Sequence, residues 1–539
     1  MAGLEDAFER IGAAAELHLP RTHAAGLSLA VTDRDGTLGA VVRGFADVAS
    51  GRPVRPDTRF QIGSISKSFA ALCVLQEEAK GTLRLDVSIN DLLPWLGLPE
   101  PFGPITLHHL LTHTSGLMTG VEHGPWGMID AIRAREQPPT FAPGAAFSYS
   151  NLGYKLIGHA LERVSGHPVH GLLLERILGP LGMTRSVGAI LEEDRADASV
   201  GYEPIDAGRV AHLQSPLAPA AWQPSNTADG SIVSTAPDLC AYARMVLAQG
   251  DPLLDAAGFE RWIGPHVDTT ERGTRYGYGW DVLEDADGRV IRHTGGTVGF
   301  TALLAIRPAD GLAVAICQNG AGVKAVLGAY ALDAIAAAIG GDPIPDVPVI
   351  PPPDAVADAG SLAGAYRSPD RAVVLEASDG GLVFHAGPLA VRLERPDEDV
   401  DVFVAPHPAL DRFVVRVIRD ADGSVAGLAH GSTWFAREGP SGAIPSREAP
   451  PEPPPHGRTG LYRADAPWLR ALRVYERAGR LYLLDPSAAE ESALIPSLDG
   501  CFALDDPARP IRVRFLDEVD GFAQTLEYNG AKLTRSFET

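Results

Sequence analysis

Apolar and polar residues alternate in short stretches near both ends of the first 340 residues. Residues 26–31 and 38–42 flank Asp35-Gly36, and residues 300–306 and 312–317 flank a Pro-Ala-Asp-Gly sequence. Alternation interrupted by turn residues of this kind is typical of antiparallel hairpins. The pattern therefore predicts one hairpin near the beginning of this block and another near its end.

Longer stretches between these hairpins place apolar residues three and four positions apart, as on one face of a helix. Residues 66–79 and 151–164 show this spacing most clearly. A last apolar helix is expected over residues 322–339, where it can pack beside a helix at the N-terminus. Strands at both ends with helices between them predict an α+β domain, whose antiparallel sheet joins the two ends of the block.

Two proline-rich stretches, 342–360 and 438–458, divide the chain. Proline fixes φ and removes a backbone donor, so such runs favour extended linkers over packed elements. They separate a large domain, residues 1–341, from two small domains, residues 361–437 and 459–539.

The two small domains are similar in sequence. Gly364-Ala365-Tyr366-Arg367 in the first corresponds to Gly460-Leu461-Tyr462-Arg463 in the second, and Asp422-Gly423 corresponds to Asp520-Gly521. Both domains contain short alternating runs broken by Asp-Gly, which predict hairpins. We expect two mutually related antiparallel β-barrels or sandwiches.

The first motif that could carry catalysis is Ser64-Ile65-Ser66-Lys67, which lies at the start of the helix expected over residues 66–79. Residues i and i+3 share a helix face, so the Ser64 hydroxyl and the Lys67 amine can meet. An amine in a low-dielectric cleft loses basicity and can accept the serine proton. The amides at a helix N-terminus also suit a developing oxyanion.

Two further motifs follow along the chain. Tyr149-Ser150-Asn151 leads into the second helix; a phenol can relay protons, and an asparagine can accept from lysine and donate to a carbonyl. His293-Thr294-Gly295-Gly296 leads toward the second hairpin, and glycines on a strand edge allow a ligand to approach the backbone closely.

Together these motifs resemble those of the penicillin-recognising serine enzymes, a family that includes class C β-lactamases, DD-peptidases, D-aminopeptidases and related esterases. Residues 110–117 and 229–235 resemble family sequences as well, and the resemblance covers about residues 10–340. It implies that Ser64 is the acylated nucleophile and that Lys67 and Tyr149 accept and transfer the proton of its hydroxyl. Which of the two is the acylation base stays open, because strongly coupled groups titrate as a unit.

The resemblance also implies the groups that bind the substrate. Asn151 would orient the substrate and Lys67, and the amides of Ser64 and Gly296 would form the oxyanion hole. His293, Thr294 and Gly295 would bind the substrate along the strand edge. His293 replaces the lysine usual in class C β-lactamases, and a neutral imidazole is a poor anchor for a carboxylate, so a β-lactamase is disfavoured.

A β-lactamase-like domain followed by two small β-barrels resembles the layout of D-aminopeptidases, whose accessory domains help to wall the active site. We therefore expect a serine hydrolase that cleaves amide or peptide bonds through an acyl-enzyme, similar to a D-aminopeptidase or a DD-peptidase. A carboxylesterase of the same fold is the first alternative. A protein that only binds a polymer or partner through its β-domains is a second, because fold alone does not define function.

Composition limits the partners. Acidic residues number 68 and basic residues 46, and a net charge of −22 disfavours binding to nucleic acid or anionic lipid. No apolar run is long enough to span a membrane, and the N-terminus has no signal-peptide pattern, so a cytoplasmic protein is expected.

His109 and His113 have the spacing of helical zinc ligands, but no His-Glu-x-x-His pattern accompanies them, so neither metal nor cofactor is expected. The expected partner is a small molecule, short peptide or ester; homo-oligomerisation is left open.

Overall fold

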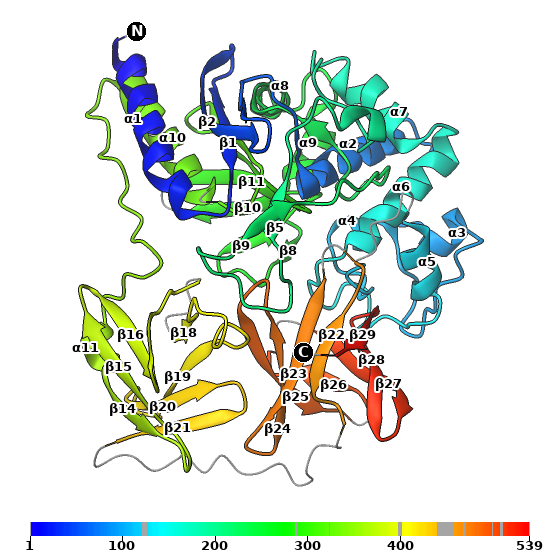
Figure 1. The fold of residues 1–539 in the computed structure, drawn as a ribbon. Helices are drawn as coiled ribbons and strands as arrows, with labels where there is room; N and C mark the ends of the chain where they lie inside the picture. Colours follow the sequence, from blue (N-terminus) through cyan, green and yellow to red (C-terminus); the bar gives the residue numbers. More distant parts are fainter. Residues whose placement is uncertain are drawn as a thin grey trace. The chain divides into compact units, whose positions relative to one another are not determined.

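The computed structural model describes residues 2–120, 127–285, 288–322, 324–396, 401–438, 457–466, 469–497, 500–506 and 510–537. The chain folds into two compact units (Figure 1). The first contains Met1–Glu203 and Ala218–Val349, and the second contains Pro204–Leu217 and Ile350–Thr539. Most of the second predicted linker, residues 439–456, lies outside the described residues.

The centre of the first unit is a nine-stranded antiparallel sheet with the strand order β3-β2-β1-β13-β12-β11-β10-β9-β8. The two predicted hairpins are its β1–β2 and β12–β13 pairs, which confirms the expected sheet joining both ends of the block. The strands are β1 Gly26–Thr32, β2 Thr37–Asp47, β3 Arg52–Pro53, β8 Val267–Asp268, β9 Thr274–Tyr276, β10 Asp281–Asp285, β11 Gly288–Thr297, β12 Phe300–Arg307 and β13 Leu312–Gln318.

Both faces of this sheet are buried. On one face, side chains of β1, β12 and β13 pack against two helices, α1 Ala2–His18 and α10 Lys324–Gly340, which lie beside each other as predicted (Figure 1). On the other face, alternate residues of the same strands join the core of the helical region. Because successive strand residues point to opposite faces, β13 is apolar almost throughout and contributes to both cores.

The helical region carries the motifs identified in the sequence. Helix α2 begins at Ser66 and ends at Ala79, as predicted. Helix α6, Asn151–Ser165, is capped by Ser150, whose side chain accepts a hydrogen bond from the Gly153 amide. The remaining helices are α3 Ile89–Leu92, α4 Leu107–Leu111, α5 Met128–Ala134, α7 Val169–Leu173, α8 Ala236–Leu247 and α9 Ala256–Ile263. There are two short strand pairs, β4 Phe60–Gln61 with β7 Val233–Ser234 and β5 Tyr202–Pro204 with β6 Leu217–Pro219. Short 3-10 helices lie at Leu19–Arg21, Gly63–Ile65 and Glu192–Asp194, and a π-helical turn lies at Leu174–Leu178; the second of these 3-10 helices carries Ser64 and leads directly into α2.

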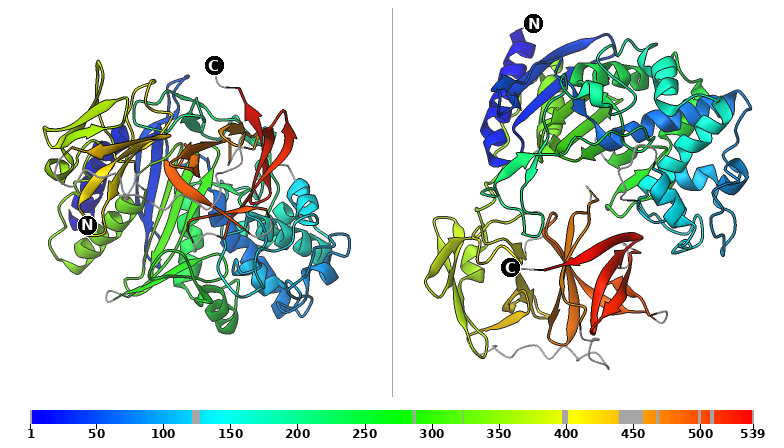
Figure 2. Two further views of the ribbon diagram at one scale, coloured as in Figure 1. Left: turned by 90° about the horizontal axis from the view of Figure 1, so that it is seen from below. Right: turned by 45° about the vertical axis from the view of Figure 1, so that its right-hand side comes forward.

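The second unit contains the two small β-domains. In the first, eight antiparallel strands form a sheet of order β17-β16-β15-β14-β21-β20-β19-β18, and a bridge between Glu394 and Val404 brings its ends together. In the second, β22 to β29 form a closed barrel (Figure 2). The elements of the first are α11 Ala359–Leu362, β14 Gly364–Arg367, β15 Ala372–Ser378, β16 Gly381–Ala386, β17 Leu389–Arg392, β18 Val402–Phe403, β19 Val415–Arg419, β20 Val425–His430 and β21 Thr433–Arg437. Those of the second are β22 Gly460–Arg463, β23 Ala471–Arg477, β24 Arg480–Asp485, β25 Glu490–Pro496, β26 Phe502–Leu504, β27 Arg512–Val519, β28 Phe522–Tyr528 and β29 Ala531–Ser536.

Two equivalent tyrosines show how closely the small domains correspond. Tyr366 and Tyr462 are both fully buried, and each hydroxyl donates to the carbonyl oxygen four residues earlier, at 2.5 Å and 2.7 Å. An arginine on the last strand of each domain, Arg437 or Arg535, lies over the same ring. The predicted relationship between the domains therefore extends to matching side-chain contacts.

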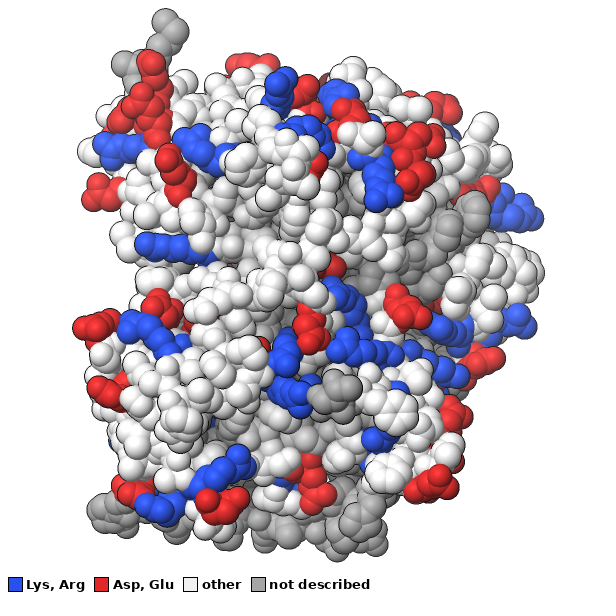
Figure 3. Space-filling model, in the orientation of Figure 1, with Lys and Arg blue, Asp and Glu red and all other residues white. Residues whose placement is uncertain are grey.

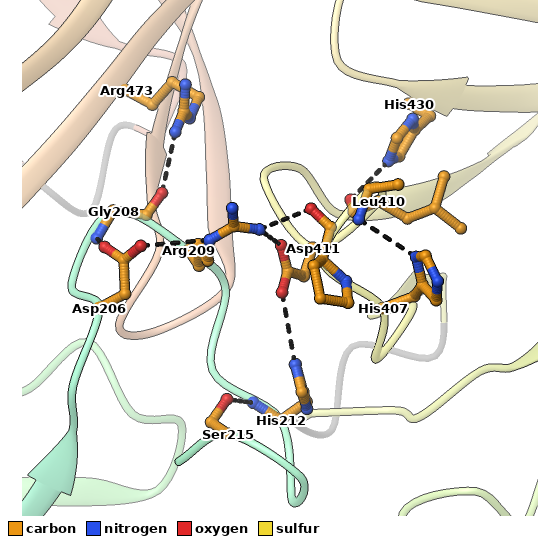
Figure 4. A network of polar contacts seen from close by, with 12 residues as sticks. Asp206, Gly208, Arg209, His212, Ser215, His407, Leu410, Asp411, His430 and Arg473 are labelled. Atoms are coloured by element: carbon orange, nitrogen blue, oxygen red, sulfur yellow. Dashed lines mark hydrogen bonds and ion pairs between the residues drawn. The ribbon is translucent and has the colours of Figure 1, made fainter. Parts of the chain in front are cut away.

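The segment Pro204–Leu217, which we call the inserted segment, was not anticipated as part of the second unit. It lies between the two small domains (Figure 4). On one side Arg473 donates to the Gly208 carbonyl at 2.9 Å, and on the other the Val210 amide donates to the Asp411 carbonyl at 2.7 Å. Val210 is fully buried in a core that both small domains share.

The surface carries charges of both signs. On the face drawn in Figure 3, basic side chains stand beside acidic ones, so the acidic excess is not gathered in one patch of that face. Among the helices of the described residues, none is long and apolar enough to cross a membrane.

Candidate active site

The side chain of Lys67 lies at the centre of the candidate site. Its Nζ lies 2.9 Å from the Ser64 hydroxyl, 2.8 Å from Oδ1 of Asn151 and 2.8 Å from the carbonyl oxygen of Asp229. Lys67 is fully buried, whereas Ser64 remains partly exposed. A substrate can thus reach the hydroxyl, while the amine is held in a fixed position behind it.

Burial lowers the pKa of Lys67 from 10.5 to about 7. The carboxylate of Asp229 opposes this effect, and the ammonium of Lys155 adds to it. Lys155 is itself buried and paired with Asp130 at 2.6 Å. A lysine with a pKa near neutrality exists partly as the free amine at pH 7 and can accept a proton.

Tyr149 contacts the same serine. Its hydroxyl is hydrogen-bonded to Ser64, and Nζ of Lys67 lies 4.8 Å from the centre of its ring. Burial raises the pKa of Tyr149 above its ordinary value, so the phenol keeps its proton.

His113 supports Tyr149 from behind. The two rings are 4.1 Å apart, and Nδ1 of His113 accepts a hydrogen bond from the Ser150 amide at 3.0 Å. His113 has a φ of 56°, a left-handed conformation that is unusual for a residue with a side chain. The backbone strain places the imidazole directly against the Tyr149 segment.

Strand β11 passes close to the turn that precedes Ser64. A Cβ atom on Gly295 would come within 1.8 Å of the Ile62 carbonyl, and one on Gly63 within 2.6 Å of the Gly296 amide nitrogen. Only glycine permits this approach, which sets the Gly296 backbone beside the residue that precedes Ser64.

One edge of β11 is open beside the site. The pairing of β11 with β10 ends at Arg292 and Asp281, whereas its pairing with β12 continues to Thr297. Within the described residues, the stretch from His293 to Thr297 therefore has a neighbouring strand on one side only. Free backbone groups on such an edge can bind an extended substrate.

His293 is buried, and both of its ring nitrogens are occupied. Nδ1 donates to the carbonyl oxygen of Thr294 at 2.6 Å, and Nε2 lies 3.1 Å from the hydroxyl of Tyr276. Burial lowers the pKa of His293 to about 3, and the positive charges of Lys67 and Arg292 act in the same direction. The imidazole is neutral at physiological pH, and the exposed side chain next to it is that of Thr294.

The structure brings Ser64, Lys67, Tyr149 and Asn151 together, and it places Gly296 next to Gly63. Three groups in this arrangement were not singled out from the sequence as site residues: the Asp229 carbonyl, Tyr276 and His113. Asp229 and His113 do lie within residues 229–235 and 110–117, the two segments that resemble family sequences, and this resemblance was the available signal.

His109 and His113, which have the spacing of helical zinc ligands, make separate structural contacts. His109 forms a capping box with Thr106 at the start of α4, whereas His113 lies against Tyr149. In the described ranges, no group of three or more histidine, cysteine, aspartate or glutamate side chains is arranged to hold a metal ion.

Residues 4–338 match the family described as Beta-lactamase. This match covers more than half of the chain, and together with the fold and the serine–lysine pair it shows that the protein belongs to the β-lactamase family. Members of this family are serine hydrolases, among them D-aminopeptidases, DD-peptidases and esterases.

Individual relatives cover different shares of the chain. A D-aminopeptidase of Cereibacter sphaeroides is 27% identical over 499 residues, which is 73% of this chain and 91% of the relative. A penicillin-binding protein of Bacillus subtilis is 27% identical over 285 residues, 48% of this chain and 60% of the relative. Among solved structures, the octameric penicillin-binding protein homologue from Pyrococcus abyssi is 23% identical, covers 80% of this chain and 99% of its own, and superposes with a TM-score of 0.57.

Proposed function

We propose that this protein is a serine hydrolase that cleaves amide or peptide bonds through an acyl-enzyme on Ser64, with the activity of a D-aminopeptidase. The contact of 2.9 Å between Lys67 Nζ and Ser64 Oγ carries the proposal, because it pairs an accessible hydroxyl with a buried amine. Burial holds the pKa of that amine at about 7, so the free amine can act as the acylation base.

In the proposed reaction, Ser64 Oγ attacks the acyl carbon while its proton passes to Lys67 Nζ. The amides of Ser64 and Gly296 bind the resulting oxyanion. The neutral phenol of Tyr149 donates a proton to the leaving amine and recovers one from Lys67. Water then attacks the acyl-enzyme, gives its proton to the same pair of groups, and releases the acid with the Ser64 hydroxyl restored.

Two observations support an amide substrate without a carboxylate next to β11. The neutral His293 provides no cation for such a carboxylate. The D-aminopeptidase from Cereibacter sphaeroides is matched over 91% of its own length and over 73% of this chain. The open edge from His293 to Thr297 would hold the substrate backbone, with Thr294 exposed beside it.

The test combines an active-site probe with a substrate panel. The full-length protein should be labelled once by a fluorophosphonate and should hydrolyse D-amino-acid amides faster than L-amino-acid amides, D-Ala-D-Ala peptides or nitrocefin. Ser64→Ala should lose labelling and turnover, while Ser50→Ala, at an exposed serine of a surface turn, should retain both. Turnover in Ser64→Ala would refute the nucleophile. A preference for p-nitrophenyl esters over every amide would favour the carboxylesterase alternative.

A further inference from the structure

The two small β-domains are joined through a shared core. Tyr475, Tyr482 and Leu484 of the barrel pack with Val402 and Val404 of the open sheet. Across the same junction, the Arg477 guanidinium donates to the carbonyl oxygen of Gly431 at 3.2 Å. This apolar and polar contact fixes one domain against the other inside the second unit.

A cavity of about 400 Å³ lies at this junction. Residues 368–371, 418 and 432–434 of the open sheet form one part of its lining, and residues 477, 478 and 482 of the barrel form the other. Sites for small ligands typically have volumes of about 300–1,000 Å³. The cavity is large enough for one small ring compound with its hydration.

Aromatic and aliphatic side chains form much of the lining. Trp434 and Tyr482 contribute rings, and Pro369 and Ile418 contribute aliphatic surface. The Tyr482 ring is already covered, because the guanidinium of Arg477 lies over it, 4.0 Å from its centre, and the Tyr475 ring stacks with it at 5.9 Å. The Trp434 ring is therefore the aromatic surface that can meet a flat, weakly polar face of a ligand.

The charged residues around the cavity are already neutralised. Arg477 is buried and forms an ion pair of 2.6 Å with Glu491. Arg371 lies 3.8 Å from Asp370 and also donates to the Thr433 hydroxyl at 2.5 Å. Each charged residue of the lining thus has a partner of opposite charge within 4.0 Å, which weakens its attraction for a charged ligand.

Polar groups of the lining both donate and accept hydrogen bonds. The hydroxyl of Ser368 bonds to Asp370, and Ser432 is exposed at the turn before β21. Hydroxyls, a carboxylate and guanidinium N–H groups together match a ligand whose own groups donate and accept at several positions.

We propose that this cavity is a binding site for a neutral carbohydrate, with one sugar ring placed against Trp434. A pyranose has the required combination of features, because its C–H groups form apolar faces while its hydroxyls donate and accept around the edge. The site lies in the second unit and is independent of the hydrolysis proposed for Ser64. It would give the enzyme a means of binding a glycan while another part of the chain carries out chemistry.

The experiment uses the full-length protein and four neutral sugars: glucose, N-acetylglucosamine, maltose and cellobiose. Ligand-observed NMR and calorimetry are measured up to about 20 mM sugar, well above the Kd of about 1 mM that one sugar ring gives. At least one sugar should bind saturably, and Trp434→Leu should raise its Kd by about tenfold or more. Trp95→Leu, at an exposed tryptophan of the first unit, is the matched control and should leave the Kd unchanged.

A second variant keeps the test decisive if Trp434→Leu fails to fold. Ser432→Trp adds a large side chain at an exposed turn of the lining and should block the cavity without disturbing the core. Ser64→Ala should bind the sugar as the wild type does. The proposal is wrong if none of the four sugars binds saturably or if binding survives both cavity variants.

Discussion

The hydroxyl of Tyr276 lies 3.1 Å from Nε2 of His293. Because Nδ1 of the same ring faces the Thr294 carbonyl at 2.6 Å, and a carbonyl can only accept, the proton of the neutral imidazole is on Nδ1. Nε2 is then an acceptor, and Tyr276 must donate to it. The Thr294 carbonyl thus fixes the tautomer of His293, and the Tyr276 hydroxyl satisfies the nitrogen that the tautomer leaves as an acceptor.

Replacing Tyr276 with phenylalanine should reduce kcat/KM. The substitution leaves Nε2 of His293 buried without a donor, which costs about 1–2 kcal/mol of folding free energy. The imidazole can relieve this cost by turning, which would disturb the β11 edge beside the site, and we expect about a five- to thirtyfold loss. Tyr278→Phe is the matched control, since the Tyr278 hydroxyl is bonded to His108 and not to His293. Equal losses in the two variants would show that Tyr276 has no specific positioning role.

Hydrolysis of nitrocefin should be weak or absent. The carboxylate of this substrate has no cation at His293, because burial lowers the pKa of that imidazole to about 3. Steady-state kinetics with nitrocefin, amino-acid amides and simple esters measure the difference. A kcat/KM for nitrocefin above those for the amides and esters would contradict this interpretation of His293.

The activity should depend on pH through Lys67. If the free amine is the base, kcat/KM should fall about tenfold per pH unit below pH 7 and level off above it, because the pKa of Lys67 is about 7. Acid-side activity that stays constant to pH 5 would exclude Lys67 as the base.

The same group affects stability in a defined direction. The pKa of Lys67 is about 7 in the folded protein and 10.5 for the ordinary side chain, so the unfolded chain binds the extra proton between these values. The contribution of Lys67 to the free energy of unfolding should therefore rise with pH over that range. Urea unfolding of wild type and Lys67→Met at several pH values should show this rise only in the wild type.

Lys67 and Tyr149 should act as one proton-handling pair. Lys67→Ala and Tyr149→Phe should each depress kcat by about a hundredfold or more, and the double variant should lose far less than the product of the two. Both side chains contact Ser64, so removal of one already interrupts the route that the other serves. Lys80→Ala, at an exposed lysine just after α2, should have no such effect. Strictly multiplicative losses would show separate roles.

Removal of the small domains should change the substrate range if they wall the active site. A fragment of residues 1–341 retains the sheet and both terminal helices, and is large enough for its own core. It also retains the inserted segment, with Val210 deprived of its packing partners. We expect this fragment to be less stable than a version in which residues 206–215 are replaced by Asn-Gly.

The shortened version is feasible because β5 and β6 pair directly, and the Ile205 amide donates to the Pro216 carbonyl at 2.9 Å. Both fragments should hydrolyse small esters, while longer or charged substrates should change in KM. Thermal unfolding and the full substrate panel measure these effects. Identical Tm values for the two fragments would contradict the expectation that an uncovered Val210 destabilises the first. Kinetics identical to those of the full-length enzyme would contradict the hypothesis that the small domains line the active site.

Local features of the site could be predicted because they depend on short-range geometry. Helix α2 begins at Ser66, and the spacing of Ser64 and Lys67 placed their side chains 2.9 Å apart. Helix α6 begins at Asn151 because Ser150 caps it, which also directs Asn151 toward Lys67. The residues of the Ser-x-x-Lys and Tyr-x-Asn motifs thus also determine where α2 and α6 begin.

Other features depend on contacts between distant parts of the chain. The Asp229 carbonyl that holds Lys67 is 162 positions away, and a backbone acceptor leaves no side-chain pattern in the sequence. The hydrogen bond between Tyr276 and His293 depends on the arrangement of three strands. The last domain is a closed barrel because β22 pairs with β29, whereas the sheet of the domain before it stays open. The alternation of apolar and polar residues within each strand does not specify this long-range pairing.

The inserted segment also has a consequence for synthesis on the ribosome. Arg209 and Val210 are translated long before Asp411 and Tyr475, the residues that cover them in the native protein. At about 5–20 residues per second, the delay is roughly 10–60 s. During this time residues 267–318, which form β8 to β13, are translated, so the hydrolase domain can complete its sheet while the inserted segment still lacks Asp411 and Tyr475. The nascent enzyme therefore exposes Val210 until both small domains have been made, so the order of translation makes this segment a candidate binding site for chaperones.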